Sequence, residues 1–428
     1  MQKMSGPRRL VVLLGALAVV AAGCTSGSGS DTAAPPTEVR IGLLTPLTGA
    51  NKSAGQDAQR GAQLAADVVN NVNSLIPLPL AEGSGLTRLG NARIKIVPAD
   101  TRSDAQRGAN EAVRLVADQG VVALVGAYDP EVTLAASQRS ERQPVPFVTG
   151  DSSLSYLTQR GLDWFFRTGP SVRTAGEGFF SLLKGAQKSG PTPTLGVLYA
   201  SDKAGNDVVE TIGDLADEGG YQIVKQVQFP AGPAPVDLSP QITEMQQANP
   251  DVVFLAPTAA TAPALVKAFA DRRYKPKGIM AYGSGFLSES VLKSAGSAGV
   301  GLCREVSWSY ELASRNLAAR EVDKLYQNKH NVPMPEEAAS SFTAVYTLAM
   351  AINNAGVTEG KRVRSALLSL DVPGQDTIMP WQGVRFDETH QNVNASSAIE
   401  QFADKTFHVV FPKDSSTREL AWPASNAA

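Results

Sequence analysis

Hydrophobic residues follow two periods along most of the chain. Short runs rich in Val, Ile and Leu, such as residues 39–44, are bounded by Thr, Pro or Gly and predict strands. Between them, segments such as residues 57–72 place apolar residues three and four positions apart and predict helices. Further strands are expected at residues 94–97, 121–125, 145–148, 194–199, 223–229, 252–256 and 278–282, and further helices at 103–119, 131–142, 206–217, 240–248 and 263–270. Alternation of this kind predicts an α/β protein with parallel sheets covered on both faces.

The alternation runs once to about residue 167 and starts again after Pro170. Two series predict two doubly wound parallel-sheet lobes. Three tail helices, at residues 317–327, 337–353 and 361–370, are expected to pack on the first lobe, and strands at 383–386 and 407–411 to close the second. The chain then crosses between lobes near 167–170, 306–310 and 372–380. The expected boundaries are 38–168 plus 308–372 for lobe 1, 169–307 plus 373–412 for lobe 2, and 413–428 for a C-terminal tail.

An insertion at residues 73–90, rich in Pro, Leu and Gly, interrupts the alternation between a helix and a strand. Insertions of this length are usually functional or disordered.

The first 37 residues differ from the rest. Three basic residues precede an apolar run at 10–23, which predicts a signal peptide over residues 1–23. The run is too short for a spanning helix, which needs about 20 apolar residues. Ala21, Ala22 and Gly23 before Cys24 resemble a bacterial lipobox with Ala21 where leucine is usual, so we expect a lipid on Cys24. The alternative is an ordinary signal peptide with an incidental cysteine. Residues 24–37, rich in Gly, Ser and Pro, predict a flexible tether.

Composition narrows the class of function. Without residues 1–23, the chain has 36 basic and 41 acidic residues, which gives a net charge of −5. It lacks the clustered basic face that is typical of nucleic-acid-binding proteins. Cys303 is the one cysteine besides Cys24, so no intramolecular disulfide is expected, and its apolar surroundings predict a buried side chain. The sequence has no His-Glu-x-x-His motif, Gly-x-Ser-x-Gly motif or Cys/His cluster, so we expect no metal and no cofactor.

Four segments, taken in order, resemble a known family. They are residues 41–57 (IGLLTPLTGANKSAGQD), 98–126, 146–158 with 164–171 (PFVTGDSSLSYLT and WFFRTGPS), and 249–269. Together they resemble the periplasmic substrate-binding proteins of the branched-chain amino acid and amide ABC importers. The resemblance implies the type I periplasmic binding fold, with two lobes joined by a three-crossing hinge. It also implies a monomer without enzymatic activity that captures a small solute in the cleft. The partners would be the permease subunits of an ABC importer and, through a lipid, the outer face of the cell membrane.

The expected site follows from this architecture, because ligands of open α/β sheets bind beyond the carboxyl ends of the strands. Ser153 stands where the family has a pocket threonine. The expected ligand-binding residues are Tyr128, Asp129, Glu131, Thr133, Asp151, Ser152 and Ser153 in lobe 1, and Asp202, Thr258, Ser284 and Phe286 in lobe 2. The alternative for Ser152 and Ser153 is that they only cap a short helix.

The chain also departs from the family pattern. Ala54 and Ala204 stand before glycines where relatives often carry an aromatic residue, and Thr258 stands at a tyrosine position. Ser284 or Gly285 stands where an acidic residue usually pairs with the ligand's ammonium group. These changes predict a wider pocket and a solute other than a leucine-type amino acid, with Asp151 or Asp129 as a charged partner from lobe 1. Tyr128 and Phe286 are expected as pocket walls, although both equally suit ordinary packing.

Two other functions are compatible with parts of the sequence. Gly150–Ser153 (GDSS) resembles the Gly-Asp-Ser block of a lipase family, and a secreted hydrolase needs a histidine within reach of the serine. The histidines, His330, His390 and His408, lie in the tail and in no matching block. A ligand-sensing lipoprotein of the same fold, which reports to a receptor, is the second alternative.

Overall fold

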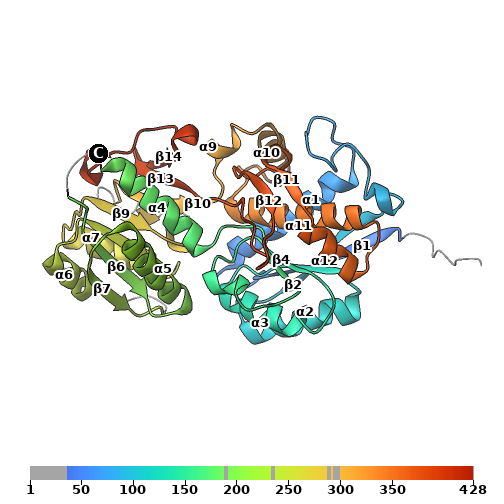
Figure 1. Cartoon of the computed structure of the whole chain (residues 1–428), viewed down its shortest axis with the longest axis horizontal. Coiled ribbons are helices and arrows are strands. Elements are labelled where there is room, and N and C mark those ends of the chain that lie inside the picture. Colours follow the sequence, from blue (N-terminus) through green and yellow to red (C-terminus); the bar gives the residue numbers. More distant parts are fainter. Residues whose placement is uncertain (1–35, 188–190, 233–236, 287–290, 293–298, 428) are drawn as a thin grey trace, which may run out of the picture. The chain divides into compact units, whose positions relative to one another are not determined.

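The computed structural model describes residues 36–187, 191–232, 237–286, 291–292 and 299–427. Cys24, the leader and most of the tether lie outside these residues. In the described part of the chain, a five-stranded and a seven-stranded sheet follow the two βα series (Figure 1). Both sheets belong to one compact unit that begins at Pro36. The expected α/β fold with parallel-sheet lobes is therefore confirmed.

The first sheet is parallel throughout, in the order β2-β1-β3-β4-β5. Its strands are β1 (Glu38–Thr45), β2 (Arg93–Asp100), β3 (Ala123–Gly126), β4 (Phe147–Thr149) and β5 (Phe165–Arg167). Helices α1 (Lys52–Asn70) and α11 (Glu336–Ala355) cover one face, and α2 (Ala105–Gln119) and α3 (Pro130–Ser140) cover the other (Figure 1). Two covered faces explain why β3 and β4 are buried along their whole length.

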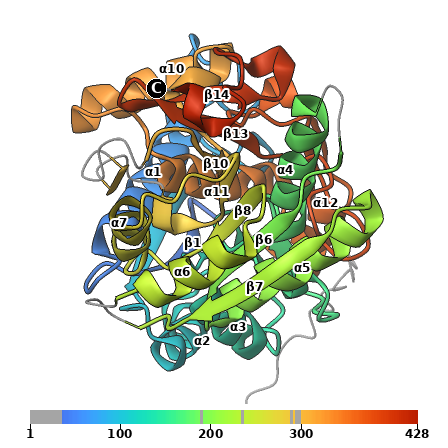
Figure 2. The ribbon, with the colours of Figure 1, turned by 90° about the vertical axis from the view of Figure 1, so that its left-hand side faces the viewer.

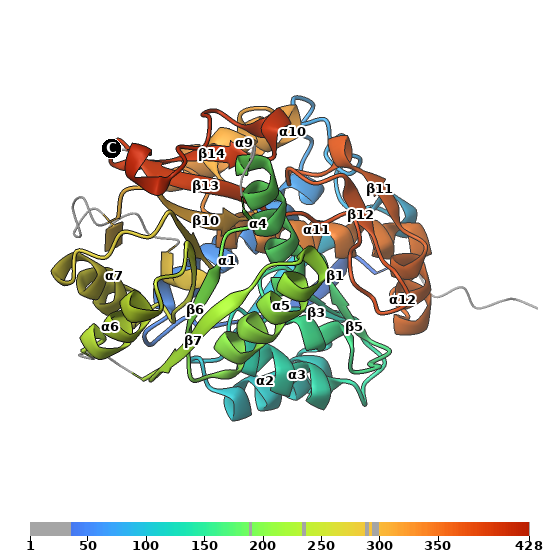
Figure 3. The same ribbon diagram turned by 60° about the vertical axis from the view of Figure 1, so that its left-hand side comes forward.

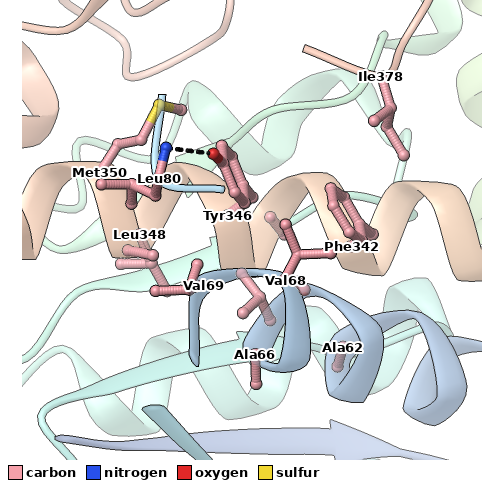
Figure 4. Close-up of a cluster of buried hydrophobic side chains, with 14 of the residues drawn as sticks. Ala62, Ala66, Val68, Val69, Leu80, Phe342, Tyr346, Leu348, Met350 and Ile378 are labelled. Carbon is pink, nitrogen blue, oxygen red and sulfur yellow. Dashed lines mark hydrogen bonds between the residues drawn. The ribbon is translucent and has the colours of Figure 1, made fainter. Parts of the chain in front are cut away.

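The contact between α1 and α11 organises the first core. Figure 4 shows Val69 of α1 beside Leu348 of α11, within a core that also contains Ala62 and Phe342. A Cβ atom on Gly61 would lie 1.9 Å from the carbonyl oxygen of Ala338, so the helix backbones approach too closely for any side chain there. The tail helices α10 (Leu317–His330) and α12 (Gly360–Leu368) contribute buried residues to the same core. The three tail helices α10, α11 and α12 therefore share the core of the first sheet.

The second sheet has the order β14-β13-β10-β9-β8-β6-β7. Its strands are β6 (Leu195–Ala200), β7 (Ile223–Phe229), β8 (Val252–Ala256), β9 (Gly278–Ala281), β10 (Leu302–Val306), β13 (Ala398–Ala403) and β14 (Thr406–Phe411). Strands β6 to β10 pair in parallel, while β13 and β14 add an antiparallel edge. Helices α4 (Val172–Ala186) and α5 (Lys203–Gly219) cover one face, and α6 (Ser239–Ala248) and α7 (Ala262–Asp271) the other (Figure 2).

The hydrophobic pattern does not predict strands β10 and β13, because both carry charged residues at inward positions. Arg304 of β10 and Glu400 of β13 form a salt bridge of 2.7 Å, with the carboxylate nearly inaccessible to solvent. Arg304 also lies over the ring of Phe407, with its guanidinium carbon 3.6 Å from the ring centre. The pair satisfies both charges within the sheet, so a strand forms without the usual apolar pattern.

The third crossing lies later than the sequence pattern predicted. Strands β11 (Asp371–Pro373) and β12 (Gly383–Arg385) pair only with each other, and Figure 3 shows this hairpin beside α12. Trp381, Val384 and Phe386 are buried in the core of the first lobe. The chain therefore crosses between Ala395, in that core, and Ala398, in β13, instead of near residues 372–380. The strand expected at 383–386 belongs to lobe 1, because its apolar side chains cover the helices there.

The insertion at residues 73–90 packs against the C-terminal half of α11. The N–H of Leu80 donates to the hydroxyl oxygen of Tyr346 at 2.8 Å (Figure 4), and the N–H of Arg88 donates to Asn353 at 3.0 Å. Its Ile76, Leu78 and Leu86 are buried. The insertion is thus part of the first core.

Shorter elements complete the described chain. They are α9 (Tyr310–Ala313) and the 3-10 turns η1 (Thr87–Leu89), η2 (Ser155–Thr158), η3 (Ser284–Phe286), η5 (Gly374–Asp376), η6 (Lys413–Ser415) and η7 (Ala424–Ala427). Across the described residues, every helix is too short or too polar to cross a membrane. Cys303 is buried in β10, as expected, and burial raises the pKa of its thiol to about 12.

Candidate functional site

A cavity of about 430 Å³ lies among the loops that follow the strands of both sheets. In the first sheet the strand order reverses between β1 and β3, and in the second between β6 and β8. Such switch points are where open α/β sheets bind ligands. Asn51, Tyr128 and Asp129 line the cavity from the first switch point, and Asp202, Gly205 and Thr258 line it from the second. The loops at both switch points therefore line the same cavity.

Six of the residues expected from the sequence line this cavity. They are Tyr128, Asp129, Asp151, Ser153, Asp202 and Thr258. Asp129 precedes α3 and accepts a hydrogen bond of 2.6 Å from the side chain of Asn51. Asp202 caps α5 by accepting from the N–H of Gly205 at 2.7 Å.

Four other expected residues lie outside the described lining. Ser152 and Thr133 are buried behind it, with their hydroxyl oxygens 2.5 Å apart, and Ser152 donates to the carbonyl of Ala127. Glu131 accepts a hydrogen bond from Lys203 at 2.7 Å. Phe286 is fully buried in the second core, so it packs instead of forming a wall. The side chain of Ser284 lies outside the described residues.

The loop after β4 is held by groups beneath it. A Cβ atom on Gly150 would lie 2.5 Å from the carbonyl oxygen of Ser340, so the glycine of the Gly-Asp-Ser block is required by packing. The buried Arg167 donates to the carbonyls of Leu154, at 2.6 Å, and Ser152, at 3.3 Å. Its Nε donates to Gln391 at 2.5 Å. Arg167 therefore ties the pocket loop to two segments of the hinge, and burial lowers its pKa to about 10.

Three acidic residues of the lining were not expected from the sequence: Glu305 of β10 and Glu336 and Glu337 at the start of α11. Acidic residues are common in the first turn of any helix, where they complement the helix dipole, so Glu336 and Glu337 carried no distinctive signal. Glu305 lies in β10, a strand that the hydrophobic pattern does not predict. With Asp151 these three residues place four carboxyl groups in the lining of one cavity, and we call these four groups the carboxyl row.

This row shifts the ionisation of its own members. Burial, together with the nearby charge of Glu337, raises the pKa of Asp151 to about 8, although a hydrogen bond with Ser340 opposes the shift. Burial and the charges of Glu305 and Glu337 hold the pKa of Glu336 well above its usual range. Burial also raises the pKa of Glu305, of Glu337 and of Asp129. The cavity therefore favours protonated carboxyl groups until something positive enters.

Side chains of the protein lie at several helix N-termini beside the cavity. Ser171 caps α4 and accepts from the N–H of Thr174, and Asp202 caps α5. Asp129 occupies the position before α3, where Pro130 supplies no N–H, and two glutamates open α11. These ends usually attract anions. Here the protein's own hydroxyl and carboxyl groups already complement them.

The geometry gives no support to a hydrolase. His330 contacts the ring of Tyr326, His390 stacks on Phe166, and His408 lies 3.3 Å from Glu311. Within the described ranges, the lining of the cavity contains no histidine, and no group of three or more His, Cys, Asp and Glu residues is placed to hold a metal ion. The arrangement suits binding.

Comparison with known proteins places this architecture in a family. A family model described as periplasmic binding protein matches residues 38–405. The Leu/Ile/Val-binding protein homolog 8 of Brucella abortus is 25% identical over 394 residues, which cover 90% of this chain and 93% of that protein.

Solved structures show the same fold. A leucine-binding protein from Thermotoga maritima is 20% identical, with a TM-score of 0.72 over 87% of this chain and 97% of that one. A branched-chain amino acid binding protein from Streptococcus pneumoniae, solved with isoleucine, has a TM-score of 0.69 at 20% identity, covering 88% and 100%. A solute-binding protein from Rhodopseudomonas palustris, solved with 3,4-dihydroxybenzoic acid, has a TM-score of 0.68 at 20% identity, covering 87% and 95%. The resemblance expected from the sequence is confirmed: the chain belongs to the periplasmic binding protein family, among relatives of the Leu/Ile/Val-binding proteins.

Proposed function

We propose that this protein is a lipid-anchored, extracytoplasmic solute-binding protein that delivers a small polar or amphipathic solute to an ABC importer. The observation that carries the proposal is the cavity at which both topological switch points meet. Its volume, about 430 Å³, falls within the range of small-molecule sites. Capture would use hinge motion of the lobes about their three crossings.

The proposed binding residues are the six expected ones that line the cavity, together with Glu305, Glu336 and Glu337. Both lobes supply polar groups to the lining, and the second lobe adds small apolar residues, including Ala256, Pro257 and Ala259. Such a mixed lining suits a solute with one polar end and one apolar body.

Blocking the cavity tests the binding site. Ala259 is exposed and lines the cavity, so Ala259→Trp fills the space without disturbing the core. The purified protein and this variant are titrated calorimetrically with solutes that raise the melting temperature of the wild type. We expect binding to be lost in Ala259→Trp and retained in Ala117→Trp, a substitution at an exposed position of α2. Retained binding in Ala259→Trp would place the site elsewhere.

Transport is tested with the same solute. Deletion of the gene should abolish high-affinity uptake of the labelled solute, and the wild-type gene, but not the Ala259→Trp form, should restore it. Unchanged uptake together with an altered transcriptional response would instead favour the sensing function.

A further inference from the structure

We propose that the solute is an organic cation, whose amine, guanidine or quaternary ammonium group is held by the carboxyl row of Asp151, Glu337, Glu336 and Glu305. This inference rests on the proposed solute-binding function and specifies its substrate class. Four kinds of observation carry it.

The first observation is the charge of the cavity. Its described lining contains acidic side chains from both lobes and from α11, and no Lys, Arg or His. Two cationic residues that neighbour lining residues in the sequence already pair elsewhere, Lys203 with Glu131 and Arg304 with Glu400. The charge of Arg304 opposes the upward pKa shifts of Glu305, Glu336 and Glu337, but burial outweighs it and the pKa of each stays raised. Arg304 also donates to the carbonyl of Phe286. A solute with a negative group would thus meet several carboxyl groups and no compensating side chain.

The second observation concerns two particular oxygens. Oε2 of Glu336 and Oδ2 of Asp129 are inaccessible to solvent and accept no hydrogen bond from any described residue, although both residues line the cavity. Burying a carboxyl oxygen without a donor is costly. A cationic nitrogen supplies both the positive charge and, in an amine or guanidine, the missing donors.

The third observation is the state of the helix N-termini. Ser171 and Asp202 cap α4 and α5, while Asp129 before α3 and the two glutamates of α11 place acidic groups at two further helix N-termini. A carboxylate on the solute would have to displace a cap at α4 or α5, and would meet a carboxyl group of the protein at α3 or α11. The cavity is therefore poorly suited to the carboxyl end of an amino acid.

The fourth observation is the apolar part of the lining. It includes Val172, Val208, Ala256 and Pro257, so an inorganic ion would leave this surface uncovered. The described residues also hold no cluster that fits a metal ion. An organic cation with an apolar body satisfies both sides of the cavity. The isoleucine and 3,4-dihydroxybenzoic acid of the related structures show that solutes differ within this fold.

A matched series of solutes tests the proposal. Isoamylamine, leucine and isocaproate share one apolar body and carry a positive charge, both charges and a negative charge, respectively. Putrescine, agmatine and choline extend the cations. Melting temperature and calorimetry are measured on the purified protein at millimolar solute. We expect stabilisation by one or more cations, and isoamylamine to bind at least tenfold more tightly than leucine or isocaproate.

Variants that neutralise carboxyl groups of the row test which of them bind the cation. The double variant Glu305→Gln/Glu336→Gln keeps the shape of the cavity and should weaken cation binding at least tenfold. The control, Glu82→Gln/Glu388→Gln, makes the same charge change at exposed positions outside the cavity and should bind as the wild type does. Asp151→Asn provides a second test should the double variant fold poorly.

The outcomes separate the two proposals. Preference for leucine or isocaproate, or cation binding that survives Glu305→Gln/Glu336→Gln and Asp151→Asn, overturns the cation proposal and leaves solute binding intact. Failure of every solute, whatever its charge and including a broad library of amides, polyols and nucleosides, counts against solute binding itself and removes the basis of both.

Discussion

The ammonium group of Lys203 in α5 donates a hydrogen bond of 2.7 Å to the carboxylate of Glu131 in α3, and so links the two lobes beside the cavity. A second link lies nearby, where the N–H of Ser155 donates to Asp207 at 2.8 Å. Neighbouring residues of both links, Pro130 and Ser153 on one lobe and Asp202 and Ala204 on the other, line the cavity. Contacts of this kind stabilise the arrangement in which both lobes face a bound solute.

Lys203→Met removes the first link. Both side chains are about half exposed, and such pairs contribute about 0.2–1 kcal/mol, so solute affinity should fall about 1.4- to 5-fold at low salt. The difference should shrink in high salt, which screens exposed charges. Lys267→Met, in an exposed pair within α7, should leave affinity unchanged. A loss far above tenfold would mean that Lys203 contacts the solute directly.

Arg167→Met tests the support beneath the pocket loop. It removes the arginine donors of Gln391 and of the buried carbonyl of Ser152, while the carbonyl of Leu154 keeps the N–H of Leu157. Each unsatisfied buried group costs about 1–3 kcal/mol. We expect the free energy of unfolding, measured in urea, to fall by about 2–5 kcal/mol. Arg173→Met removes only exposed pairs with Glu177 and Glu218 and should cost about 0–1 kcal/mol. Equal losses would show that Arg167 is not a structural tie.

Gly61→Ala tests the close contact between α1 and α11. The new methyl group meets the backbone of Ala338, which cannot move aside as a flexible side chain can. Overpacking of this kind typically costs about 1–3 kcal/mol. Gly213→Ala, in α5 with no heavy atom within 4 Å of the added carbon, should instead stabilise by about 0.5–1 kcal/mol. Calorimetric melting of both variants measures the contrast, and a stabilised Gly61→Ala would refute the contact.

The carboxyl row predicts how stability depends on pH. Because the folded protein holds a proton on Asp151 up to about pH 8, while the unfolded chain releases it near pH 4, folding favours the protonated form. Stability of the solute-free protein should therefore fall as pH rises through this window. The slope between pH 7 and 8.5, where histidine titration contributes little, should be smaller in Asp151→Asn. Glu305, Glu336, Glu337 and Asp129 shift in the same direction, so part of the slope should remain. An identical slope in Asp151→Asn would contradict the assignment.

Cation binding should release protons for the same reason. A positive group favours the ionised carboxyl groups, so the binding enthalpy should differ between buffers of high and low ionisation enthalpy at pH 7. Affinity for choline, whose charge does not titrate, should rise with pH toward pH 8 if choline is among the solutes bound. A binding enthalpy independent of the buffer would contradict this linkage.

Cys24→Ser tests the proposed anchor. Labelling of growing cells with an alkyne-bearing fatty acid should mark the wild-type protein and not the variant, and only the wild type should sediment with membranes. Label on the variant, or release of the wild type by high salt, would contradict anchoring through Cys24.

The two βα series could be predicted from the sequence because each strand and helix carries its own apolar period. Strands β7 and β8 have the expected bounds, and α6 begins one residue before its expected start. Strands β10 and β13 could not be predicted in this way, because the buried salt bridge between Arg304 and Glu400 puts charged residues where an apolar strand pattern is expected. The strand predicted at 383–386 was expected in the second lobe, because strand propensity says nothing about which core receives the side chains.

The site was predictable where it follows strand ends. Asp129, Asp151 and Thr258 follow predicted strands and line the cavity. Glu336 and Glu337 reach it from a tail helix whose position depends on packing over 200 residues of intervening chain, which no local pattern records. Thr133 and Phe286 were expected in the site but are buried, because Thr133 lies on the inner face of α3 and Phe286 packs into the core of the second lobe.

A crystal structure of the protein with a cation selected by the solute series tests the central claim most directly. We predict density for the solute in the cavity, with its cationic nitrogen about 3 Å from a carboxyl oxygen of Glu336 or Glu305 in an amine or guanidine, and its apolar part against Ala256 and Pro257. A solute bound outside the cavity, or one whose cationic group points away from the carboxyl row, would contradict the account.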